Sequence, residues 1–158
     1  MERIESFRIN HLNLFSGLYV SRKDKRDGVT VTTFDLRITA PNREPVIDMP
    51  ALHTIEHLGA TFLRSTEEKE SIVYFGPMGC RTGFYFITLD TLSKAGAIAL
   101  TRSALKFCAE FEGEIPGVSA EECGNYRDHD LETAKKEAEM IVEVLKNWTE
   151  EKLVYPTK

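Results

Sequence analysis

The sequence predicts an α+β fold in which an antiparallel β-sheet is covered by helices. Two stretches, residues 17–39 and 71–89, are rich in β-branched and aromatic residues and have turn residues near their middles, which is typical of β-hairpins. Three others, at about 50–64, 93–111 and 130–148, repeat apolar residues every three or four positions, which indicates helices. The resulting order of elements, β-β-α-β-β-α-α, is typical of α+β folds.

The N-terminal third is expected to be β-structure. Short strands are predicted at residues 6–12, "SFRINHL", and at residues 17–21, "GLYVS". The turn-rich segment 22–28, "RKDKRDG", then leads into residues 29–39, "VTVTTFDLRIT", which we expect to pair back as a hairpin. The alternation of apolar residues slips by one position at residues 32–34, which indicates a β-bulge.

The first helix follows the proline-rich segment "APNREPVIDMP". Asp48 is suited to cap this helix and Pro50 to lie in its first turn, so we expect a helix from about residue 50 to residue 64. Its apolar residues at helical spacing form one buried stripe, which comprises Leu52, Ile55, Gly59 and Phe62.

The rest of the chain is expected to add a hairpin and two helices. Residues 71–89 divide into two strands around a tight Pro-Met-Gly turn, and residues 93–111 form the second helix. The last helix is predicted at 130–148, where Asp128 and Asp130 suit the positively polarised N-terminus. Its single apolar face comprises Leu131, Ala134, Ala138, Ile141, Leu145 and Trp148.

Length and composition narrow the class of protein. We expect one domain over residues 1–158, with no nucleic-acid partner because the formal net charge is −5. No apolar run approaches the roughly 20 residues of a membrane span, and the start "MERIESFRIN" lacks the core of a signal peptide. The three cysteines are widely spaced and odd in number, so we expect a cytoplasmic protein without a disulfide framework. A chain of this size folds without a metal, so a bound metal would have a chemical role.

The segment "HTIEH" predicts a metal site on the first helix. His53 and His57 are four residues apart, so their side chains project from one face of the helix. Glu56 lies angularly between them, and the three residues occupy an arc beside the buried stripe. H-x-x-E-H is the inverted order of a zincin signature, in which two imidazoles hold a divalent cation and the glutamate handles a proton.

Two histidines need a third ligand from elsewhere in the chain. The candidates are Cys123, Cys80, His11 and His129, of which Cys123 lies in a loop that a following glycine leaves free to bend. Two histidines, a cysteine and one open position form a catalytic arrangement, because a structural site has four protein ligands. His129 is also suited to start the last helix. Cys108 is expected in the core, on the apolar side of its helix.

Cys80 has two interpretations. It follows a tight turn and precedes Arg81, and a thiol beside a cation has a lowered pKa that suits it to carry protons or to act as a nucleophile. The alternative is a thiol that merely fills the turn.

Five motifs occur in order along the chain: "ESFRINHL", "FDLRITAPN", "HTIEHLGATFLR", "GPMGCRTGFY" and "ECGNYRDHDL". Their combination resembles the S-ribosylhomocysteine lyase (LuxS) family nearly from end to end. Many members of that family have an aspartate where this chain has Tyr74.

The resemblance implies an α+β homodimer whose two active sites lie at the subunit interface. It also implies one divalent metal per subunit, iron(II) in the working enzyme, with zinc or cobalt able to occupy the site. By motif, the metal ligands are His53, His57 and Cys123, the acid/base pair is Glu56 and Cys80, and the substrate contacts are Ser6, His11 and Arg37.

The reaction implied is the cleavage of S-ribosylhomocysteine to homocysteine and 4,5-dihydroxy-2,3-pentanedione. This reaction belongs to the activated methyl cycle and supplies the autoinducer-2 precursor for quorum sensing. Two other functions are compatible with the "HTIEH" helix. One is a small metallopeptidase of the inverzincin kind, and the other is a non-enzymatic metal-binding module whose fourth position is closed by Cys80 or His11.

Overall fold

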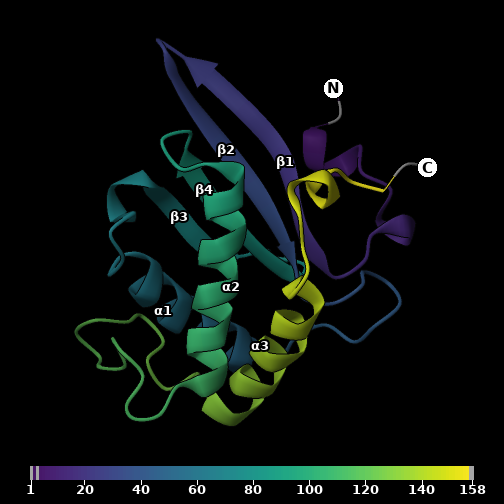
Figure 1. Cartoon of the computed structure of the whole chain (residues 1–158). Helices are drawn as coiled ribbons and strands as arrows, with labels where there is room; N and C mark the ends of the chain where they lie inside the picture. Colours follow the sequence, from purple (N-terminus) through teal and green to yellow (C-terminus); the bar gives the residue numbers. More distant parts are fainter. Residues whose placement is uncertain (1, 3, 157–158) are drawn as a thin grey trace.

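The computed structural model describes residue 2 and residues 4–156 and contains one antiparallel sheet and three α-helices (Figure 1). The sheet has four strands in the order β1-β2-β4-β3. The strands are β1 (Gly17–Arg26), β2 (Val29–Arg37), β3 (Ile72–Pro77) and β4 (Gly83–Leu89). The helices are α1 (Met49–Leu63), α2 (Lys94–Glu110) and α3 (Leu131–Leu145). The predicted fold class and order of elements are confirmed.

The β1–β2 hairpin is longer than the sequence suggested. β1 continues through most of the segment expected as a turn, and the turn itself is only Asp27 and Gly28, both with positive φ (51° and 82°). Two residues with positive φ form the tight turn whose twist matches that of a hairpin. The predicted bulge exists, but the extra residue is Ser21 of β1, opposite the expected position in β2.

The strand predicted at residues 6–12 is wrong. This segment contains two short 3-10 helices, η1 (Glu5–Phe7) and η2 (His11–Asn13). The Asn10 side chain accepts a hydrogen bond from the backbone of Leu12, a local contact that competes with strand pairing. Phe7 and Leu12 are also 69% and 61% exposed, so no buried face selects an extended conformation here.

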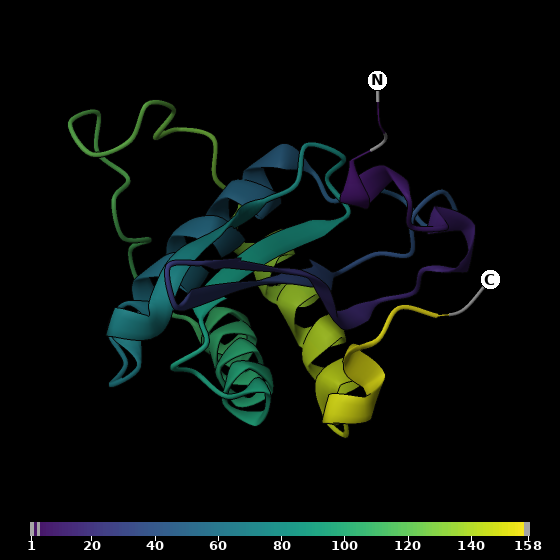
Figure 2. The same ribbon diagram turned by 90° about the horizontal axis from the view of Figure 1, so that it is seen from above.

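The core forms where α1, α2 and α3 pack on one another and on the sheet. Figure 2 shows α2 and α3 on one side of the sheet, opposite the N-terminal 3-10 helices. Gly59 of α1 lies against the Phe75 ring, so a Cβ there would approach the ring to 2.5 Å. The predicted stripe of α1 is buried except for Phe62, which is partly buried. The predicted face of α3 also packs inward, with Leu131 and Trp148 only partly buried.

The other face of the sheet carries a polar cluster under the C-terminal segment. Asp35 and Arg37 of β2 are 1% and 3% exposed. The segment after α3 crosses β1, where the Trp148 indole donates a hydrogen bond to the Leu18 carbonyl (2.9 Å). Within the part of the chain described, no helix has the length and hydrophobicity needed to cross a membrane.

Candidate metal centre

His53 and His57 are oriented by hydrogen bonds to the connection between α2 and α3. This connection, residues 111–130, extends away from the helices in both ribbon views (Figures 1 and 2). Near its two ends, the Asp128 carbonyl lies 2.9 Å from His53 Nδ1 and the Pro116 carbonyl 2.7 Å from His57 Nδ1. A carbonyl accepts only from a protonated nitrogen, so each neutral ring has its Nε2 lone pair free to bind a cation.

Cys123 lies beside this pair at a distance suited to a shared metal. Its Sγ is 3.5 Å from His53 Nε2. In a tetrahedral site with metal–sulfur bonds of about 2.3 Å and metal–nitrogen bonds of about 2.0–2.1 Å, sulfur and nitrogen donors are about 3.5 Å apart. The loop is held by the Cys123 amide, which donates to the Ser119 carbonyl (3.0 Å). The Asn125 amide also donates to the sulfur (3.4 Å).

His129 is the fourth member of the cluster, which corrects its expected role at the start of α3. The capping residue of α3 is instead Asp130, whose side chain accepts from the Thr133 amide. The His129 ring stacks on His53 with centroids 4.1 Å apart. Its Nδ1 lies 3.1 Å from the Thr54 hydroxyl. The donor atoms of all four residues lie within 4.8 Å of one another, and they belong to His53, His57, Cys123 and His129.

A divalent cation fits this set of donors. His129 Nε2 is buried without a hydrogen-bond partner among the described residues, and a cation, or a molecule bound to that cation, would satisfy its lone pair. Burial, with His53 and His57 nearby, lowers the pKa of His129 to about 4, so its ring is neutral at neutral pH. Imidazole nitrogens with one thiolate suit transition metals such as iron, cobalt and zinc better than magnesium or calcium.

Glu56 lies on α1 between the two histidines in sequence and is partly buried. It is not among the four clustered donors. A carboxylate at this position can exchange protons with a molecule bound at the metal centre without being needed to hold the ion.

Cys80 occupies a strained turn between β3 and β4, apart from the clustered donors. The turn closes through the Arg81 amide and the Met78 carbonyl (2.9 Å), and Arg81 has a φ of 59°. Such a conformation is uncommon for a residue with a side chain and is often found at functional sites. The Cys80 side chain is exposed, so its thiol is accessible to a small molecule.

Arg37, and not the adjacent Arg81 suggested by the sequence, is the cation in contact with the Cys80 thiol. Its Nη1 lies 3.6 Å from Cys80 Sγ, and the Thr82 hydroxyl lies 3.1 Å from the same sulfur. Partial burial opposes ionisation, but the hydrogen bonds of Thr82 and the charge of Arg37 lower the pKa of Cys80 below its ordinary value. Thiolate formation at Cys80 is therefore favoured.

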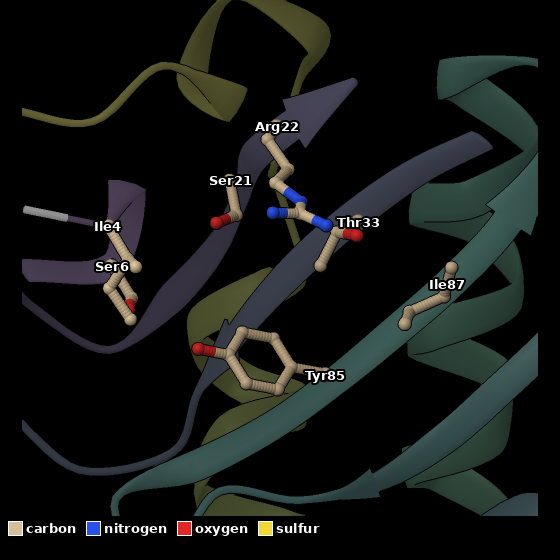
Figure 3. Close-up of a pocket in the computed structure, with 7 residues that line it drawn as sticks. All are labelled: Ile4, Ser6, Ser21, Arg22, Thr33, Tyr85 and Ile87. Atoms are coloured by element: carbon tan, nitrogen blue, oxygen red, sulfur yellow. The ribbon is translucent and has the colours of Figure 1, made fainter. Parts of the chain in front are cut away.

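The three residues expected to contact substrate lie in different surroundings. Arg37 is buried against Asp35 and Thr82. His11 is partly exposed, and its Nδ1 lies 3.0 Å from the Ile9 carbonyl. Ser6 lines a cavity of about 290 Å³ over the second face of the sheet, where Figure 3 shows the Tyr85 hydroxyl pointing toward it. None of the four clustered donors lines this cavity.

Sequence reasoning left one feature of the site open and missed a second. His129 was one of four candidate third ligands, and its contact with the donor cluster depends on the fold of the connection before α3. The contact of Arg37 with Cys80 joins residues 43 positions apart. One signal was available for the second, because Asp35 and Arg37 alternate on one face of a predicted strand and charged residues there need partners.

Comparison with known proteins gives full-length matches. A family model described as S-Ribosylhomocysteinase (LuxS) matches residues 4–152. An S-ribosylhomocysteine lyase from Finegoldia magna is 53% identical over 156 residues, which cover 99% of both chains. The protein of the same name from Clostridium acetobutylicum is 51% identical over 157 residues, again 99% of both chains. That from Phocaeicola vulgatus is 50% identical over 160 residues, which cover 100% of this chain and 99% of the relative.

Replacing Cys123 with alanine is expected to release the metal, because it removes the thiolate donor. The loss of affinity should exceed the roughly 10–100-fold typical of removing a partner that only orients a ligand. Metal content after dialysis measures it, and the cobalt-substituted protein should lose its sulfur-to-metal absorption band. The control is Cys80→Ala, which removes an exposed thiol outside the cluster and should retain the ion. Full metal content in Cys123→Ala would show that the ligand assignment is wrong.

Proposed function

This chain belongs to the S-ribosylhomocysteinase (LuxS) family, and we propose that it cleaves S-ribosylhomocysteine to homocysteine and 4,5-dihydroxy-2,3-pentanedione. The observation that carries the proposal is sequence identity: the chain is 50–53% identical, over nearly its whole length, to relatives named S-ribosylhomocysteine lyase. A cluster of three histidines and a cysteine agrees with metal-dependent chemistry. The product is the autoinducer-2 precursor, so the proposal includes a role in the activated methyl cycle and in quorum sensing.

The reaction requires proton transfers rather than a hydride acceptor. The ribose opens to an aldehyde, two isomerisations move the carbonyl along the sugar, and β-elimination expels homocysteine. A bound divalent cation supplies Lewis acidity that stabilises negative charge developing on the sugar oxygens. The residues of the chain must then remove and return protons at successive carbons.

Glu56 and Cys80 are proposed as the two groups that carry these protons. Glu56 neighbours both histidines on α1, so it suits carbons close to the metal centre. Cys80 is accessible and its thiolate is favoured by Arg37 and Thr82, so it suits the removal of a proton near neutral pH. Two carriers from different elements can act on different carbons of the sugar, as successive isomerisations require.

His53, His57 and Cys123 are proposed as the metal ligands, with iron(II) as the working metal and zinc or cobalt as replacements. Catalysis needs an open position for a substrate oxygen. We therefore assign His129 a place beside the centre, stacked on His53, and leave the fourth position to substrate.

A homodimer is proposed to complete the site, with Ser6, His11 and Arg37 as substrate contacts. Ser6 lines a cavity that none of the clustered donors shares, so a second copy of the chain is a natural source of the missing contacts. The N-terminal segment also exposes apolar side chains, which is typical of surfaces that bind another protein. These side chains are Ile4, Phe7, Leu12 and Phe15.

Two other functions are less well supported. The peptidase is disfavoured because the matched relatives are named as lyases. The metal-binding module, with all four metal positions filled by protein ligands, would leave the lowered pKa of Cys80 unexplained. The three cysteines are all free, which agrees with the proposed cytoplasmic location. Protein cleavage by the purified chain would favour the peptidase, and four protein ligands without an exchangeable water would favour the module.

Glu56→Gln and Cys80→Ala should each retain the metal and the fold but lose most turnover. General acid–base groups typically contribute about 100- to 10,000-fold, and a reaction with several transfers should be at the upper end. Thiol release from S-ribosylhomocysteine and deuterium uptake from solvent measure the loss, with metal content determined on the same samples. If Cys80→Ala released homocysteine at the parent rate with its metal bound, Glu56 alone would have to carry the chemistry.

Mixing two inactive variants tests whether sites are shared between subunits. If Ser6 or His11 of one subunit serves the Glu56 of the other, mixed dimers of Glu56→Gln with Ser6→Ala or His11→Ala contain one intact site. Activity should then recover to about a quarter of the parent value, since half of the dimers are mixed and each has one working site. Subunit exchange is verified by mass, and no recovery after complete exchange would contradict the shared site.

A further inference from the structure

The C-terminal segment reaches the face of the sheet that carries the Cys80 environment. Trp148 anchors it to β1, with the indole edge against the Tyr19 ring (centroids 5.7 Å apart). Leu153 is 2% exposed and belongs to the core. Tyr155 then stacks on the Tyr19 ring itself, with centroids 5.2 Å apart and planes 23° from parallel. This part of the chain is therefore fixed in place rather than lying loosely on the surface.

Tyr155, near the end of this segment, contacts the buried carboxylate of Asp35. Its hydroxyl donates a hydrogen bond of 2.7 Å to Asp35 Oδ2. Asp35 is almost fully buried, so each donor that reaches it contributes strongly to holding its charge. The same carboxylate pairs with Arg37, whose Nε lies 2.8 Å from Oδ1 and whose Nη2 lies 3.0 Å from Oδ2.

Arg37 connects the Asp35 carboxylate to the turn that bears Cys80. With Nη2 donating to Asp35 Oδ2 and Nε close to Oδ1, Nη1 faces the Thr82 hydroxyl (2.5 Å) and Cys80 Sγ (3.6 Å). The guanidinium is planar and rigid, so fixing one edge on the carboxylate fixes where the other edge lies. A continuous set of contacts thus joins Tyr155 to the thiol.

We propose that Tyr155 is a positioning residue for Cys80, acting through Asp35 and Arg37. The Tyr155 hydroxyl takes part of the negative charge of Asp35, which leaves more of the Arg37 charge to stabilise the Cys80 thiolate. It also holds the carboxylate in the orientation that directs Nη1 at the sulfur. The role of Cys80 in turnover belongs to the proposed function, whereas its thiol reactivity does not depend on it.

The Tyr155 hydroxyl is protonated, so it can donate a hydrogen bond to Asp35 at every pH of interest. Burial, and then the neighbouring Asp35 charge, raise the pKa of Tyr155 above its ordinary value. The hydroxyl therefore keeps its proton throughout the pH range in which a thiol titrates. Tyr19 provides a matched comparison, because it belongs to the same aromatic pair but its hydroxyl donates to the Phe15 carbonyl (3.1 Å) and not to Asp35.

Tyr155→Phe tests the proposal, with Tyr19→Phe as the control. Both variants lose one hydroxyl from the same aromatic pair and keep the stacked rings. The rate of Cys80 alkylation by iodoacetamide is measured against pH, with the Cys80 peptide followed by mass spectrometry. Tyr155→Phe should move the pH midpoint upward by about half a unit to one unit, which is roughly three- to tenfold slower alkylation below the midpoint. Tyr19→Phe should leave the midpoint unchanged.

A second variant should shift the Cys80 midpoint in the opposite direction, which a general loss of packing would not do. Asp35→Asn keeps the shape of the side chain but removes the charge that competes for Arg37, so the midpoint for Cys80 should move downward. Folding of each variant is checked by thermal unfolding. An unchanged midpoint in Tyr155→Phe, an equal shift in Tyr19→Phe, or an upward shift in Asp35→Asn would overturn the proposal.

Steady-state kinetics separates this inference from the proposed function. Tyr155→Phe should lower kcat for thiol release by about the same factor as the alkylation rate, with little change in KM. An active enzyme whose Cys80 alkylation is unaffected would overturn the inference alone. If Tyr155→Phe shifted the midpoint of Cys80 but the parent protein had no lyase activity, the proposed function would be overturned and the inference would stand.

Discussion

Two hydrogen bonds hold the candidate metal centre together. They join the Nδ1 atoms of His53 and His57 to backbone carbonyls at the two ends of the connection between α2 and α3. Each bond selects the tautomer that frees Nε2 for a metal, and each fixes one end of the loop that carries Cys123. The helix supplies two donors at a fixed spacing, and the loop supplies a third whose position depends on those same two rings.

The second candidate centre depends on a buried ion pair on the other side of the sheet. Burying Asp35 and Arg37 costs desolvation energy that their attraction alone does not always recover. Additional donors and acceptors, Tyr155 and Thr82 among them, offset that cost and fix the geometry. Such an arrangement contributes little to stability but defines the charge next to Cys80, so its value lies in the chemistry of the thiol.

Much of this architecture could be predicted from the sequence because it depends on local patterns. The three helices follow from apolar spacing, and the projection of His53 and His57 from one face follows from their separation of four. The strand predicted at residues 6–12 failed because a side-chain hydrogen bond at Asn10 and the absence of a buried face outweighed a short apolar alternation. The positions of His129 and Arg37 depend on contacts between distant segments, which no local pattern contains.

The most direct test of the account is thiol release from S-ribosylhomocysteine by the purified protein under anaerobic conditions. The metal content of the same sample is measured, so that activity is expressed per bound ion. The account predicts release of one homocysteine per substrate, loss of activity when the metal is removed, and recovery when iron(II) or cobalt(II) is restored. A protein with its metal bound that releases no homocysteine, or one that remains fully active without metal, would contradict it.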